Sequence, residues 1–160
     1  IAPSQWVKDL YVSKFGFPEN KISNWPVGIE EFNNTREVNY DCLIYFKRRD
    51  QKELDVIKKF LVKNGFTYRM VEYGTYGEDG FRQLVNSAKF CFLINGTESQ
   101  GIAVQEIMSM GVPIIAWDIK EWLDQGEAYC VPATSVPFWD ERCGEKFYSI
   151  ADLDLSLIHI

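Results

Sequence analysis

The sequence is organised around residues 97–117, which read TESQGIAVQEIMSMGVPIIAW. An apolar run at 90–94 comes immediately before this stretch and predicts a buried strand. Ser99 can cap a helix that begins at the next residue, and we expect this helix to end at Gly111. The β-branched run at 112–117 predicts the next strand. Strand, turn, helix and strand in this order are typical of a parallel sheet.

The predicted helix is apolar on nearly all sides, so we expect it to be buried, and it carries the carboxylate of Glu106. A buried charge is costly unless another group hydrogen-bonds to it. Glu106 therefore needs either a ligand or an internal arginine such as Arg69 or Arg82. The turn before the helix offers free backbone N–H groups, which favour an anion, and Gly101 would let a ligand approach the backbone closely.

Strand and helix patterns alternate along the rest of the chain. Asp50 and Glu53 form a capping box, and Asp79 is expected to cap a further helix. Cys42 and Cys91 fall in predicted strands, where they act as small core residues. The alternation predicts an α/β fold, a Rossmann-like parallel sheet with helices on both faces. The predicted strands are 41–46, 68–73, 90–94, 112–117 and 128–131; besides the helix before Gly111, helices are predicted from Ser4 to Gly16, over 51–64 and from Asp79 to Ala88.

Three cations, Lys47, Arg48 and Arg49, follow the strand at 41–46 directly. Cations beside a helix N-terminus interact unfavourably with the helix dipole, so helix stability does not explain why they are there. The carboxyl ends of strands are also where open α/β sheets bind ligands. The triplet therefore indicates an anionic ligand, with a solvated basic loop as the alternative.

The motif around Glu98 and Glu106 resembles that of a known family. Seven residues separate the two glutamates, a glycine lies three residues after the first, and Gly-x-Pro follows the helix. This pattern resembles the donor-binding motif of retaining GT-B-fold glycosyltransferases, the family 4-like group 1 glycosyl transferases. That family usually reads Glu-Gly-Phe-Gly and then Glu-Ala-Met-Ala-x-Gly-x-Pro, from which this chain departs at Ser99-Gln100 and Ile107.

The resemblance implies that the chain is the C-terminal, donor-binding half of such an enzyme and is only part of it. Residues 1–35 would be the tail of an N-terminal acceptor domain and the hinge. Residues 36–160 would be a Rossmann-like nucleotide-sugar-binding domain, incomplete at its C-terminus. The missing acceptor domain would pack against this half, and the fragment alone would be inactive.

The resemblance also implies a role for individual residues. Glu98, Lys47 and Arg48 would be catalytic, with Glu98 on the donor sugar and the two cations on the diphosphate. Glu106 would accept hydrogen bonds from ribose hydroxyls. The remaining donor-binding positions are Lys52 on the diphosphate, Tyr76 near the base, and the turn of Ser99, Gln100, Gly101 and Ile102.

The composition of the chain argues against several classes of protein and of site. The net charge of −6 argues against a nucleic-acid partner, and no stretch is apolar for the length of a membrane span. We expect a cytoplasmic protein that needs no cofactor and no metal. Asp152-Leu153-Asp154 matches a metal-binding signature of another glycosyltransferase fold, but it adjoins residues 155–160, which resemble translated adapter sequence. The single histidine, His159, lies in that tail, which weakens any histidine-based catalytic or metal site.

The implied activity is transfer of a hexose from a UDP- or GDP-linked sugar to an unknown glycan, lipid or protein acceptor, with retention of anomeric configuration. One alternative is a nucleotide-sugar epimerase of the same fold, which would interconvert two nucleotide sugars. The other is a non-catalytic sugar-nucleotide-binding module, which would bind the donor without releasing nucleoside diphosphate.

Overall fold

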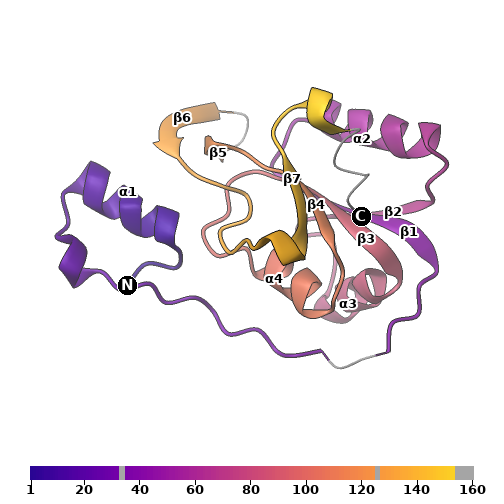
Figure 1. Ribbon diagram of the computed structural model, residues 1–160, viewed down its shortest axis with the longest axis horizontal. Coiled ribbons are helices and arrows are strands. Elements are labelled where there is room, and N and C mark those ends of the chain that lie inside the picture. The colour runs from indigo at the N-terminus through magenta and orange to yellow at the C-terminus, as the bar shows by residue number, and fades with distance from the viewer. Residues whose placement is uncertain (33–34, 125–126, 154–160) are drawn as a thin grey trace.

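A computed structural model describes residues 1–32, 35–124 and 127–153 and shows an α/β fold around a five-stranded sheet (Figure 1). The strand order is β2-β1-β3-β4-β7, and every neighbouring pair is parallel. The predicted α/β class with a parallel sheet is confirmed, and the arrangement is compatible with a Rossmann-like fold. The strands are β1 (Tyr40–Lys47), β2 (Tyr68–Glu72), β3 (Ala88–Asn95), β4 (Ile114–Trp117) and β7 (Gly144–Phe147).

Helices cover both faces of the sheet, as predicted (Figure 1). Successive side chains of a strand point to opposite faces, so one strand supplies both halves of the core. On one face, Ile44 of β1 packs in a cluster with Ile57 of α2 (Gln51–Lys63). On the other face, Leu43 packs with residues of α3 (Glu78–Asn86) and α4 (Ile102–Ser109). Cys42 and Cys91 are fully buried in this core, as expected.

One predicted helix cap is confirmed, and two are wrong. The Asp50–Glu53 capping box is present at the start of α2. Helix α1 begins after Ser4, as predicted, although the Ser4 hydroxyl makes no capping bond. Helix α3 begins after Gly77, so Asp79 lies inside its first turn, where a carboxylate still complements the helix dipole. Helix α4 begins after Gly101 rather than after Ser99.

The fifth strand of the parallel sheet is β7, not the predicted strand at 128–131. Residues 128–131 lie in β6 (Glu127–Pro132), which pairs antiparallel with β5 (Glu121–Asp124) in a separate two-stranded sheet. At the start of β7, Gly144 has a φ of 132°, and a Cβ there would lie 2.0 Å from the carbonyl oxygen of Ile114. Only glycine fits at this position, and that backbone requirement is not visible as a hydrophobic pattern.

The N-terminal helix α1 (Gln5–Phe15) stands beside the β5–β6 hairpin rather than against the main sheet (Figure 1). The rings of Trp6 and Trp122 meet edge to face, with centroids 6.0 Å apart. Shortly before β1, Arg36 donates to the carbonyls of Ala88, Lys89 and Gly111. Whether residues 1–35 belong to another domain stays a prediction. Among the described residues, no helix is long and apolar enough to cross a membrane.

Candidate functional site

The strand order places a crevice between the carboxyl ends of β1 and β3. After β1 the chain enters α2 on one face of the sheet, whereas after β3 it enters α4 on the opposite face. In open α/β sheets such a divergence is the usual position of a ligand site. A cleft of about 290 Å³ lies here. Its lining residues are Tyr45, Lys47, Tyr73, Tyr76, Glu98, Ser99, Gln100, Gly101, Ile102, Ala103 and Glu106.

An ion pair lies in this cleft. Nζ of Lys47, the last residue of β1, is 2.6 Å from Oε1 of Glu98, and the two side chains are only 14% and 10% exposed. Nδ2 of Asn95 donates to the same oxygen over 3.2 Å. The Lys47 ammonium also lies 4.2 Å from the ring centroid of Tyr73, which is a cation–π distance. The structure therefore brings together two residues that the sequence predicts to be catalytic.

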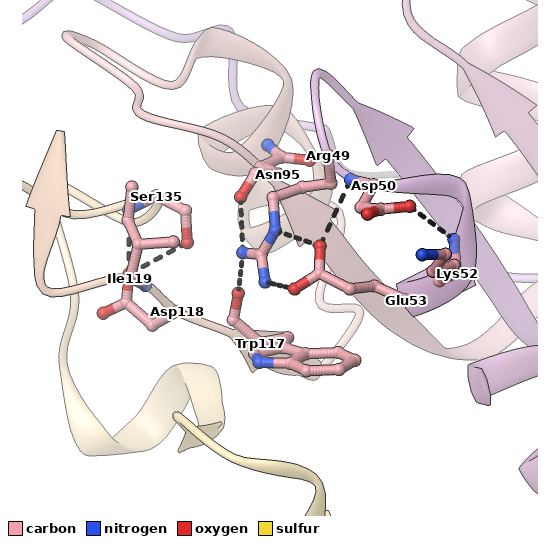
Figure 2. A network of polar contacts seen from close by, with 9 residues as sticks. All are labelled: Arg49, Asp50, Lys52, Glu53, Asn95, Trp117, Asp118, Ile119 and Ser135. Carbon is pink, nitrogen blue, oxygen red and sulfur yellow. Dashed lines mark hydrogen bonds and ion pairs between the residues drawn. The ribbon is translucent and has the colours of Figure 1, made fainter. Parts of the chain in front are cut away.

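The backbone of Glu98 is held on both sides. Its N–H donates to the carbonyl of Thr134 over 3.1 Å, and its carbonyl accepts from the indole N–H of Trp6 over 2.8 Å. Thr134 is fixed in turn by buried Asp118, whose Oδ1 accepts from the Thr134 hydroxyl and from the backbone N–H of Ser135, both over 2.8 Å. Figure 2 shows Asp118 with Ser135 at the end of β4. The position of Glu98 thus depends on α1 and on the segment after β6.

Arg49 of the basic triplet lies in the protein interior, with its side chain 3% exposed. Its guanidinium donates from Nε to Glu53 over 2.7 Å and from Nη1 to the carbonyls of Asn95 and Trp117, both over 3.0 Å (Figure 2). It also lies over the Trp117 ring, 5.3 Å from the centroid. Arg49 therefore ties the carboxyl ends of β3 and β4 to α2 and does not face the cleft.

Arg48 and Lys52 do not line the cleft either. Arg48 has a φ of 53° and lines a second cleft, of about 500 Å³, which Ser99 shares and α1 borders. Lys52 lies exposed in the first turn of α2, on the face of the sheet opposite α4. Among the three cations predicted to hold a diphosphate, the structure brings only Lys47 to the ion-paired cleft.

The predicted anion-binding turn does line the cleft. Gly101 has a φ of 63°, and a Cβ there would lie 3.4 Å from Pro137. The positive φ favours glycine at the turn into α4, whereas the space around the position would admit a Cβ in ordinary contact with Pro137. The first N–H groups of α4 have no partner within the helix, and Gly101, Ile102 and Ala103 at this end of the helix line the cleft. Ile102 is 47% exposed, so α4 is less buried than expected.

Glu106 projects from α4 into the same cleft, and its side chain is 20% exposed. Burial raises the pKa of its carboxyl above the ordinary value, and the nearby guanidinium of Arg82 lowers it in part. Arg82 was one of the two partners expected, but its Nη2 is 3.8 Å from Glu106 Oε1, beyond hydrogen-bond distance. The same Nη2 lies 3.6 Å from Glu30. Glu106 has only a weak internal partner and keeps acceptor capacity for a ligand.

Three tyrosines form the remaining wall. The hydroxyls of Tyr45 and Tyr76 are 3.1 Å apart, and burial raises the pKa of both, so both stay protonated at neutral pH. The ring of Tyr76 stacks on Phe81, with centroids 4.8 Å apart. Tyr73 is 51% exposed and covers Lys47 instead. An aromatic ring beside a cation can hold a planar group next to an anionic one.

Sequence reasoning missed four residues of this site: Tyr45, Tyr73, Asn95 and Trp6. Tyr73 and Asn95 end or directly follow predicted strands, and polar residues at the carboxyl ends of parallel strands are a usable signal. Trp6 carried no such signal, because its contact with Glu98 spans 92 residues. Asp154 and His159 lie outside the described residues.

The cleft therefore offers a cation, two carboxylates, helix N–H groups and aromatic rings within one small space. This set can hold an anion beside a polyhydroxylated group, because the carboxylates accept from hydroxyls and the cation and N–H groups donate to the anion. Comparisons of the chain with protein-family models, with curated proteins and with solved structures yield no match.

Proposed function

We propose that the chain is the donor-binding half of a retaining glycosyltransferase of the GT-B type. It would bind a nucleoside diphosphate sugar, UDP- or GDP-linked, and transfer the sugar to an acceptor hydroxyl. A single observation carries the proposal: Lys47, Glu98, Glu106 and the N-terminus of α4 meet in one cleft at the carboxyl ends of β1 and β3.

Each group has a role in this proposal. Glu106 accepts hydrogen bonds from the ribose hydroxyls, and Glu98 accepts them from the donor sugar. Lys47 and the first N–H groups of α4 neutralise the diphosphate as the bond to the anomeric carbon breaks. Stabilisation of developing charge by fixed donors of this kind is often the largest single contribution to catalysis. Arg48 and Lys52, which lie outside the cleft, have no assigned role in it.

The proposal is tested by calorimetry on residues 1–160 with UDP, GDP, uridine and guanosine. We expect one of the two diphosphates to bind at least about tenfold more tightly than its nucleoside, since each charge-assisted hydrogen bond contributes about 1.5–3 kcal/mol. We also expect no release of diphosphate from UDP-glucose or GDP-mannose by this chain alone, because transfer needs an acceptor domain to close on the substrates.

Equal affinity for diphosphate and nucleoside would contradict a phosphate subsite at Lys47. If the protein interconverts two nucleotide sugars, the result would favour the epimerase function over the transferase function. Robust sugar transfer by residues 1–160 would show that the catalytic unit is already complete.

Replacing Glu106 by glutamine is expected to lower nucleotide affinity by about tenfold, because the amide keeps one acceptor but loses the charge, and tenfold corresponds to about 1.4 kcal/mol. The thermal stability of the unliganded protein should stay the same or rise. The reason is that the carboxylate is partly desolvated, and the guanidinium of Arg82, the one cation paired with it among the described residues, lies 3.8 Å away. Glu37→Gln, an exposed carboxylate, is the matched control.

The stability difference between wild type and Glu106→Gln should depend on pH. The folded-state pKa of Glu106 is raised, so the folded protein binds this proton more tightly than the unfolded chain does. The cost of the ionised carboxylate is therefore fully present above the folded pKa and disappears below the unfolded one. Melting curves of the two proteins should converge as the pH falls through this window. A large loss of stability in Glu106→Gln at neutral pH, with unchanged nucleotide affinity, would instead make Glu106 a structural partner of Arg82.

A further inference from the structure

The charges of the cleft are unfavourable for a bare anion. Among the described residues that line it, Lys47 is the only cation, and it faces two carboxylates, Glu98 and Glu106. Lys47 is already paired with Glu98 over 2.6 Å in a place where little solvent screens the pair. A diphosphate that enters must therefore share Lys47 with Glu98 and accept a nearby carboxylate.

Each member of the Lys47–Glu98 ion pair has a second partner nearby. The Lys47 ammonium has a second partner besides Glu98, the ring of Tyr73, whose centroid is 4.2 Å away. If Glu98 loses the ammonium, its Oε1 still accepts from Asn95 over 3.2 Å. Neither group is left without a partner, so the exchange avoids the full cost of a buried unpaired charge.

The change is confined to side chains. Thr134 holds the backbone N–H of Glu98, and Trp6 holds its carbonyl. Lys47 is the last residue of β1 and is paired with Asn95 in the parallel register. Because both backbones are held by these bonds, we expect the exchange to take place by rotation of the two side chains.

Resting on the proposed function, we propose that Glu98 is an internal counter-anion of Lys47 that makes the site select the intact nucleotide sugar over the bare nucleoside diphosphate. The sugar hydroxyls of an intact donor replace the ammonium as hydrogen-bond donors to Glu98, which leaves Lys47 for the diphosphate. A bare nucleoside diphosphate brings no such hydroxyls, so Glu98 keeps competing for Lys47. The nucleoside diphosphate that remains after sugar transfer is therefore bound weakly and dissociates readily.

The test compares wild type with Glu98→Gln, using UDP, GDP, UDP-glucose and GDP-mannose as probes in calorimetry. Glutamine keeps the size and one acceptor but no longer neutralises Lys47. We expect the variant to bind the preferred diphosphate about tenfold more tightly, the effect of roughly one charge-assisted hydrogen bond. The affinity for the sugar nucleotide should not rise, so the preference for the intact donor shrinks by at least about tenfold. Glu72→Gln, an exposed carboxylate at the end of β2, controls for the loss of one negative charge at the same edge of the sheet.

The possible results separate this inference from the proposed function. If wild type binds neither the diphosphates nor the sugar nucleotides, the proposed function fails. If wild type binds a diphosphate and folded Glu98→Gln binds it no more tightly, the counter-anion role fails while the proposed function stands. Should Glu98→Gln not fold, Glu98→Asp withdraws the carboxylate by one methylene and keeps the charge. It should show a smaller gain in diphosphate affinity, and no gain would overturn the inference.

Discussion

Replacing Arg49 by methionine is expected to lower the free energy of unfolding by about 3–5 kcal/mol, the range for breaking a buried ion pair by removing one partner. Methionine keeps an unbranched side chain but loses the guanidinium that lies over the Trp117 ring. It removes the donors to Glu53 and to the carbonyls of Asn95 and Trp117, which lie at the ends of two central strands. Denaturant unfolding of the two proteins measures the difference.

Two further variants make this expectation specific. Lys52→Met removes a cation from the same helix start, but Lys52 is exposed, so its effect should stay within about 0.5 kcal/mol. Adding Glu53→Gln to Arg49→Met should recover part of the loss, because it removes the unpaired carboxylate that the single variant leaves. An Arg49→Met protein within about 1 kcal/mol of wild type would mean that the network contributes little to stability.

Arg49 also shows where sequence reasoning stopped. The run Lys47-Arg48-Arg49 predicted a single anion site. In the structure Lys47 is the last residue of β1 and lines the cleft. Arg48 has a positive φ and lines the second cleft, which α1 borders. The side chain of Arg49 is buried. Once a chain leaves a strand, the period of two no longer fixes where side chains point, so neighbouring cations can serve different purposes.

Strands β1, β3 and β4 could be predicted because they are continuous apolar runs, buried on both faces. Strand β7 could not, since only Phe147 of its four residues is apolar and a steric requirement at Gly144 decides its place. For the site, the glutamate spacing identified Glu98 and Glu106 but not the partner of Glu98. Lys47 is 51 residues away and reaches Glu98 only through the register that pairs Lys47 with Asn95. Strands β1 and β3 are not consecutive in the sequence, because β2 lies between them, so no single local motif shows which of their residues become neighbours.

Lys47→Met is expected to weaken nucleoside diphosphate binding by about a hundredfold, or about 2.8 kcal/mol, which is the upper part of the range for one charge-assisted hydrogen bond. Two effects add. The diphosphate loses the only cation among the described residues that line the cleft, and Glu98 becomes an uncompensated carboxylate beside it. Nucleoside binding should change far less, because ribose and base do not need the ammonium. Calorimetry with UDP, GDP and their nucleosides measures both, and melting curves confirm that the variant is folded.

The double variant Lys47→Met with Glu98→Gln separates the two effects. It lacks the cation but also lacks the repelling carboxylate, so we expect its diphosphate affinity to lie between those of wild type and Lys47→Met. The recovery, about tenfold if the repulsion matches one charge-assisted contact, measures how strongly the ion pair shapes the site. Arg48→Met is the matched control, because Arg48 lines the other cleft and should affect the diphosphate far less. Equal losses of nucleoside and diphosphate in Lys47→Met, or a larger loss in Arg48→Met, would move the phosphates to the groove between Ser99 and α1.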